Sequence, residues 1–214
     1  MRRRTFDTLM STAGVAITIV LVVAGALLMV GYNFANDNVT DQLSAQKIFF
    51  PQADNEGLKD PRIGPYVKQY AGQQLTTGAQ AEAYANHYIG VHIADAADGK
   101  TYAEMGTVQS GLRADIATAK AANDTAKVTA LEAELAEASS TRDTIFKGET
   151  LRGLLLNAYA FWKVGQIAFI AAIAAFVAAG VMGVLSILGV WHLRHVPAEE
   201  ELLAPRVKGK PVTA

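Results

Sequence analysis

Two long stretches without a formal charge dominate the pattern of apolar and polar positions. The first holds 29 residues between Asp7 and Asp37, and the second is the 30-residue stretch Val164–Leu193. The hydrocarbon core of a bilayer is about 30 Å thick, and a helix of roughly 20 apolar residues crosses it. The pattern therefore predicts two transmembrane helices, at residues 9–34 and 164–191.

Two tryptophans flank the second apolar stretch. Trp162 and Trp191 are 29 positions apart, which corresponds to about 43 Å along a helix. Rings at that separation would reach the headgroup regions on opposite sides of a bilayer, where tryptophan is enriched. Both residues are therefore predicted to be interface anchors.

Small residues recur at every fourth position in the second stretch: Ala171, Ala175, Ala179 and Gly183. Such a stripe lets another helix approach closely, which favours helix association in lipid. We predict these four residues as helix-packing positions, with the first span or another copy of the chain as the partner. The alternative is that alanine is simply common here. Neither span contains Asp, Glu, Lys or Arg, which argues against a transporter.

Basic residues close to the two apolar stretches predict the orientation. Arg2, Arg3 and Arg4 precede the first stretch, and four more follow the second: Arg194, Arg206, Lys208 and Lys210. Basic residues in short flanks stay in the cytoplasm. We therefore expect cytoplasmic segments at residues 1–8 and 192–214, and an extracytoplasmic middle, in the plasma (inner) membrane.

The first stretch could instead be a cleaved signal peptide, since Arg3-Arg4-Thr5-Phe6 is similar to the twin-arginine pattern. The apolar part of a signal peptide usually has about 7 to 15 residues and ends at a small-x-small cleavage site. This stretch is longer and has no clear site of that kind. The pattern favours a retained span.

The middle of the chain begins with a segment rich in helix breakers. Pro51, Pro61 and Pro65 interrupt it, and Lys47–Pro51 has the pattern of an extended apolar stretch. We interpret residues 35–76 as a linker held against the domain that follows.

Capping signals indicate helices in the next segment. Thr77 with Gln80, and Thr101 with Glu104, match the capping box, in which the two side chains bond each other's backbone. The helix that starts after Thr77 has an apolar face with Ala81, Tyr84, Tyr88 and Val91, and Asp98-Gly99 is predicted to end it. Residues 77–150 are therefore predicted to form a helical domain.

Three-and-four spacing of apolar residues continues through the second half of this domain and shifts phase at Ala122–Thr125. A hairpin turning there and one long helix with a stutter both fit the shift. Residues 151–163 form an apolar juxtamembrane segment that lies at the interface or continues the second span outward. The predicted fold is an all-α membrane protein, in which two transmembrane helices flank a small extracytoplasmic helical bundle or hairpin domain.

Charge and composition exclude some functions. Residues 37–163 hold 12 basic and 16 acidic groups, so the middle lacks the basic surplus that nucleic-acid binding requires. The sequence has no cysteine, which excludes disulfides, thiolate metal sites and a lipoprotein anchor.

We predict no catalytic, cofactor-binding or metal-ligating residue. His87 and His92 would point about 140° apart on an α-helix, and a packed aromatic cluster with Tyr84 and Tyr88 explains the region more simply. His192 and His195 suit interfacial anchoring. Three glutamates at Glu132, Glu134 and Glu137 have the pattern of a solvated helix face. No nucleophile elbow, phosphate loop or dinucleotide fingerprint is present in the sequence.

Several motifs resemble those of a group of uncharacterised two-span actinobacterial membrane proteins. The resemblance covers most of the chain, and its main motifs are Asp41-Gln42-Leu43, Gln46–Pro51, Tyr70–Gln74, Gln80–Ala85, Gly99–Tyr102 and Gly148–Tyr159. Members of that group sometimes carry an automatic label as aromatic ring-opening dioxygenases. Such chemistry needs an iron site, and two misaligned histidines do not provide one. The resemblance implies no activity.

These observations favour a non-enzymatic envelope protein, an accessory or scaffolding subunit that acts through protein–protein contacts in a homo-oligomer or a larger membrane complex. A small-ligand sensor or binding domain is the alternative, although only 20 residues follow Arg194. A membrane-bound enzyme is the third hypothesis.

Overall fold

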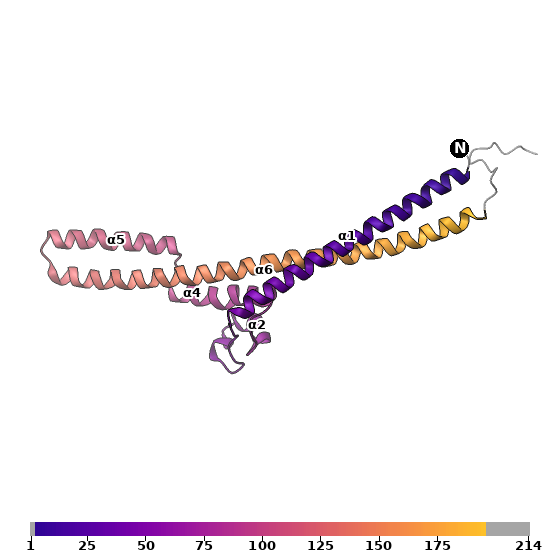
Figure 1. Cartoon of the computed structure of the whole chain (residues 1–214). Coiled ribbons are helices and arrows are strands. Elements are labelled where there is room, and N and C mark those ends of the chain that lie inside the picture. The colour runs from indigo at the N-terminus through magenta and orange to yellow at the C-terminus, as the bar shows by residue number, and fades with distance from the viewer. Residues whose placement is uncertain (1–2, 196–214) are drawn as a thin grey trace, which may run out of the picture. The chain divides into compact units, whose positions relative to one another are not determined.

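The computed structural model describes residues 3–195, and 84% of the chain is helical (Figure 1). Within the described residues no β-strand is present. The basic residues predicted to orient the chain at Arg2, Arg206, Lys208 and Lys210 lie outside the described part.

Two helices, α1 (Arg3–Ala45) and α6 (Thr125–Leu193), are long and apolar enough to cross a membrane. Only 11% of the most apolar window of each helix is buried. The core helix of a soluble protein would be mostly buried, so these helices differ from that class.

The chain divides into two compact units. One, here called the apolar pair, combines the residues up to Asn33 with those from Gln166 onward. The other, the core unit, is Phe34–Gly165.

Within the apolar pair, the two helices run antiparallel. Residues 11, 14, 18, 25 and 32 of α1 meet residues 189, 186, 183, 176 and 169 of α6, in that order. The steps of three, four and seven along α1 are those of a heptad seam, the spacing at which two helices stay in contact along their length.

Helix α1 does not end at residue 34, as the sequence analysis placed it, but continues to Ala45. Its last turns direct Ala35, Val39 and Leu43 into the interior, where each is at most 4% exposed. These residues are four apart and keep the helical period, and the first proline follows only at Pro51. Residues 35–45 of the predicted linker are therefore helical.

The rest of the predicted linker is part of the hydrophobic core. Phe50, Leu75 and Val67 are almost wholly buried, and they pack in one cluster with residues of the later helices. The extended apolar stretch is confirmed, because Phe49 pairs with Gln74 in an antiparallel bridge. The short helices of this region are η1 (Glu56–Lys59), α2 (Gly64–Val67), η2 (Lys68–Tyr70), α3 (Gly78–Tyr84), the π-helical turn η3 (Ala85–Ile89) and α4 (Gly90–Ala96).

Both predicted capping boxes are confirmed. The backbone N–H of Gln80 donates to the Thr77 hydroxyl at 3.3 Å, and the backbone N–H of Thr77 donates to Gln80 Oε1 at 3.0 Å. Thr101 and Glu104 make the same reciprocal pair at the start of α5 (Tyr102–Ala121). Each box satisfies backbone N–H groups that a helix start leaves unpaired.

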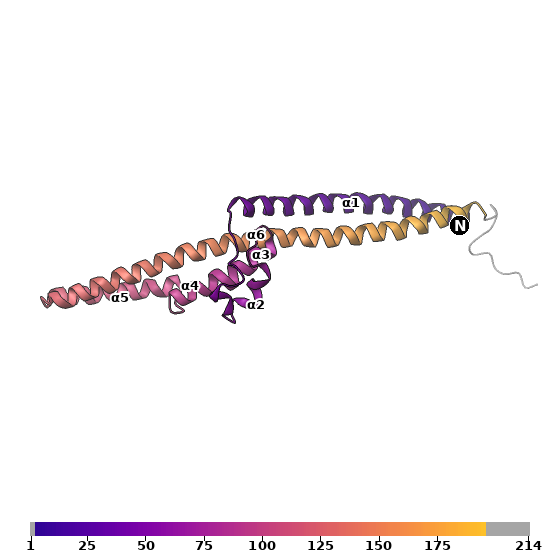
Figure 2. The ribbon, with the colours of Figure 1, turned by 90° about the horizontal axis from the view of Figure 1, so that it is seen from below.

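A hairpin forms at the phase shift. Helix α5 ends at Ala121 and α6 begins at Thr125, with Asn123 in the left-handed region at φ 56°. Asparagine tolerates this conformation better than most residues. Figure 2 shows α5 alongside the first part of α6. Residues 151–163 lie inside α6, which continues through them without a break.

Candidate functional site

The closest approach within the apolar pair involves one Ser-x-x-Gly motif in each helix. A Cβ added at Gly14 would overlap the hydroxyl of Ser186, and one added at Gly189 would lie 2.7 Å from Ser11 Oγ. Because the helices are antiparallel, the serine of each motif packs on the glycine of the other. We call these four residues the Ser–Gly lock.

Both serines of the lock are buried, at 8% exposure for Ser11 and 6% for Ser186. Ser186 Oγ has no hydrogen-bond partner among the described residues. Its position against Gly14 is that of an oxygen approached by a glycine Cα–H group, a weak contact that recurs where helices pack closely. The lock therefore depends on the absence of side chains at the two glycines.

The predicted packing stripe lies on or beside this seam. Ala179 is 4% exposed, and a Cβ at Gly183 would lie 3.6 Å from Thr18 Cγ2. Ala171 and Ala175 are half-buried, whereas Ala172 is fully buried. A four-residue step advances roughly 40° around a helix, so a strict stripe drifts away from a seam that the heptad spacing follows.

The two predicted interface anchors have different surroundings. Trp191 is 63% exposed. Trp162 is half-buried, and its ring covers the start of α3, where a Cβ added at Gly78 would lie 2.7 Å from Trp162 Cδ2. The glycine lets α3 approach α6 closely at this point.

A polar layer crosses the seam between α5 and α6. Gln109, only 4% exposed, donates from Nε2 to Ser139 Oγ at 2.9 Å and accepts at Oε1 from Arg142 Nη1 at 2.9 Å. The Arg142 guanidinium also lies 4.1 Å from the centre of the Tyr102 ring. A buried polar group at a seam position penalises every register that leaves it unpaired. Sequence reasoning missed this layer, although Gln109 follows Met105 at seam spacing.

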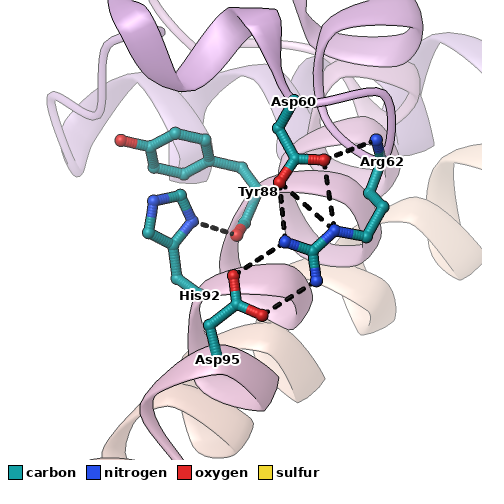
Figure 3. A network of polar contacts seen from close by, with 5 residues as sticks. All are labelled: Asp60, Arg62, Tyr88, His92 and Asp95. Carbon is teal, nitrogen blue, oxygen red and sulfur yellow. Dashed lines mark hydrogen bonds and ion pairs between the residues drawn. The ribbon is translucent and has the colours of Figure 1, made fainter.

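An exposed ion-pair cluster joins the first short helices to α4 (Figure 3). Arg62 donates to Asp60 Oδ2 at 2.6 Å and to both carboxylate oxygens of Asp95 at 2.8 and 2.9 Å. Hydrogen bonds from Arg62 lower the pKa of both carboxyls, and the two carboxylates raise the pKa of Arg62. Exposed pairs of this kind contribute little stability, so the cluster orients a loop. We call it the clasp.

The two outer histidines lie in different environments. The ring of His87 stacks on Tyr66 at 3.5 Å, whereas His92 Nδ1 lies 2.7 Å from the carbonyl oxygen of Tyr88 (Figure 3). In the part of the chain that the structure describes, no group of three or more His, Asp or Glu side chains could hold a metal ion.

A surface cavity of about 280 Å³ combines aromatic and charged walls. Its main lining residues are Tyr66, Glu82, His87, Tyr159, Trp162 and Lys163, and we call it the aromatic pocket. The Glu82 carboxylate is held by Asn86, which donates from Nδ2 to Oε1 at 2.9 Å. Helices α2, α3 and α6 and the turn η3 each supply part of the wall.

Comparison with known proteins adds no relative: no family model matches the chain, and the searches of curated proteins and solved structures found no match.

Proposed function

We propose that the chain is an integral plasma-membrane protein in which α1 and α6 both cross the bilayer. The termini are cytoplasmic and the core unit is extracytoplasmic. The low burial of the two apolar windows supports this arrangement. The Ser–Gly lock supports retention of α1, because a signal peptide that is cleaved needs no close packing against a second span.

In this proposal the protein is a non-enzymatic accessory or scaffolding subunit, and the hairpin of α5 and α6 contacts the partner protein. One observation carries the idea: the buried polar layer holds the hairpin in a single register, while its outer faces present exposed alanines such as Ala117 and Ala133. Alanine on an outer face lets a further helix pack at short distance, and a rigid element binds with less loss of entropy.

Photo-crosslinking in cells tests the role of the hairpin. A photoreactive residue replaces Ala117 or Ala133 in the full chain, and the matched control carries it at Asp54, which is also exposed. We expect a discrete adduct with one other polypeptide from the two hairpin positions but not from the control. Membrane-inserted protein that gives no adduct from either hairpin position would contradict the partner role.

Topology has an independent test. A reporter inserted beside Asn123, in the hairpin turn, is expected to be active only outside the cytoplasm. A cytoplasmic signal would overturn the proposed arrangement, whatever the crosslinking shows.

Small-ligand binding is a second candidate function, favoured by the aromatic pocket. The pocket has a carboxylate, a lysine and several rings within one cavity, which is the mixture of apolar walls and few polar groups that ligand sites use.

A further inference from the structure

The walls of the aromatic pocket carry two pairs of stacked rings. Tyr66 and His87 are parallel within 6°, and Tyr159 and Trp162 stack with centroids 6.2 Å apart. Ring faces attract cations through their quadrupole, tryptophan most strongly. The rings therefore favour a positively charged group in the cavity.

One acidic and one basic side chain complete the lining. Glu82 is half-buried and is oriented by its bond from Asn86, and Lys163 is exposed. A ligand with an ammonium near Glu82 and the rings, and an anionic group near Lys163, would match both charges. An anion alone would meet the repulsion of the carboxylate.

The position of Lys163 in the sequence indicates where such a ligand would come from. It directly precedes Val164, the first residue of the second predicted span, and it follows Trp162. Lysine and tryptophan at the end of a span lie among lipid headgroups. A cavity of about 280 Å³ is at the small end of ligand pockets, so it suits a headgroup better than a whole lipid.

We propose that the aromatic pocket binds the headgroup of an aminophospholipid, such as phosphatidylethanolamine. The ammonium lies against the Glu82 carboxylate and the ring faces, and the phosphate pairs with the Lys163 ammonium. A primary ammonium donates hydrogen bonds to a carboxylate, which a trimethylated one cannot do. This proposal rests on the membrane insertion proposed above, but not on the hairpin's partner role.

Native mass spectrometry of the full chain in detergent tests the site. The delipidated protein is mixed with equal amounts of phosphatidylethanolamine, phosphatidylcholine and phosphatidylglycerol with identical acyl chains, and the lipids that stay bound are counted. We expect phosphatidylethanolamine to be retained about two- to fivefold more than phosphatidylglycerol, the range expected of a partly exposed cation site. Soluble glycerophosphoethanolamine in excess should displace it.

Two variants separate the two charges. Glu82→Gln is expected to abolish the preference for phosphatidylethanolamine, and Lys163→Gln to lower retention of all three lipids. Asp115→Asn and Lys127→Gln make the same charge changes at exposed positions in the hairpin and should leave lipid binding unchanged. Circular dichroism confirms that each variant folds.

Equal retention of the three lipids by the wild-type chain would overturn the proposal, and so would an unchanged preference in folded Glu82→Gln. Failure of the membrane proposal gives a different result, since the reporter beside Asn123 would then be cytoplasmic. Absence of a hairpin adduct would leave the lipid result unaffected.

Discussion

Helix α6 takes part in two antiparallel helix pairs that follow the same spacing but use different residues. Against α1 its seam is closed by serine, glycine and alanine. Against α5 the seam contains Met105, Ile116 and Ile145, which are buried, together with the polar layer around Gln109. The exposed surfaces also differ, because the apolar pair presents aliphatic side chains and the hairpin presents charged ones.

This difference follows from the solvent that each pair is proposed to face. In water, burying large apolar side chains drives helices together. In lipid that driving force is absent, so close backbone contact between small residues replaces it. The Ser–Gly lock and the hairpin core are thus two solutions to one packing problem.

Removing the close approach in the apolar pair should have the largest effect. Gly14→Leu places a side chain where Ser186 lies, and overpacking of this kind costs about 1–3 kcal/mol. The sequence has no cysteine, so a disulfide between Thr18→Cys and Gly183→Cys reports the seam, and we expect Gly14→Leu to abolish most of it. Gly180→Leu is the control, because nothing lies within 4 Å of a Cβ there. Equal crosslinking in both variants would show that the lock is not needed.

The hairpin should respond to loss of a polar partner rather than to added bulk. Gln109→Leu leaves Ser139 and Arg142 without their hydrogen bonds to this side chain, and an unpaired buried polar group costs about 1–3 kcal/mol. Hydrogen exchange of α5 amides in the full chain should become faster, while Ser110→Ala at the adjacent exposed position changes little. If exchange is unaltered in Gln109→Leu, the polar layer does not hold the register.

Acid should produce the smallest effect, confined to the core unit. The pKa values of Asp60 and Asp95 are lowered below 3.8 by Arg62, and that of Glu104 is lowered below 4.5 by hydrogen bonds from Thr101. Groups with a lowered folded pKa stabilise the fold above the unfolded value, and this is lost as pH falls through the folded one.

The clasp can be tested by comparing wild type with Arg62→Gln in detergent. Wild type should melt slightly higher at neutral pH, and the difference should disappear as pH falls below about 3.8. The disulfide between positions 18 and 183 serves as the control and should form equally in both. A difference that persists at low pH would show that Arg62 acts through packing instead of charge.

Local signals along the chain were sufficient for much of the helical part. Capping boxes at Thr77 and Thr101 and the turn at Asn123 follow from neighbouring residues alone, and the structure confirms them. The two apolar stretches are equally legible, since length and composition define them.

Prolines, in contrast, were misleading about residues 35–76. They suggested a linker, but Phe50, Val67 and Leu75 from this segment are among the most buried residues of the core. The aromatic pocket was also not visible, because its walls come from segments nearly 100 positions apart in the chain.

The sequence by itself determined the helical class, the two long apolar helices and the local caps, because these depend on neighbours within a turn or two. Only the tertiary structure decided that Ser11 packs on Gly189, that Gln109 joins Arg142, and that Glu82 shares a cavity with Lys163. Such pairs depend on the register between helices, and that register is set by the sum of many weak contacts along each seam.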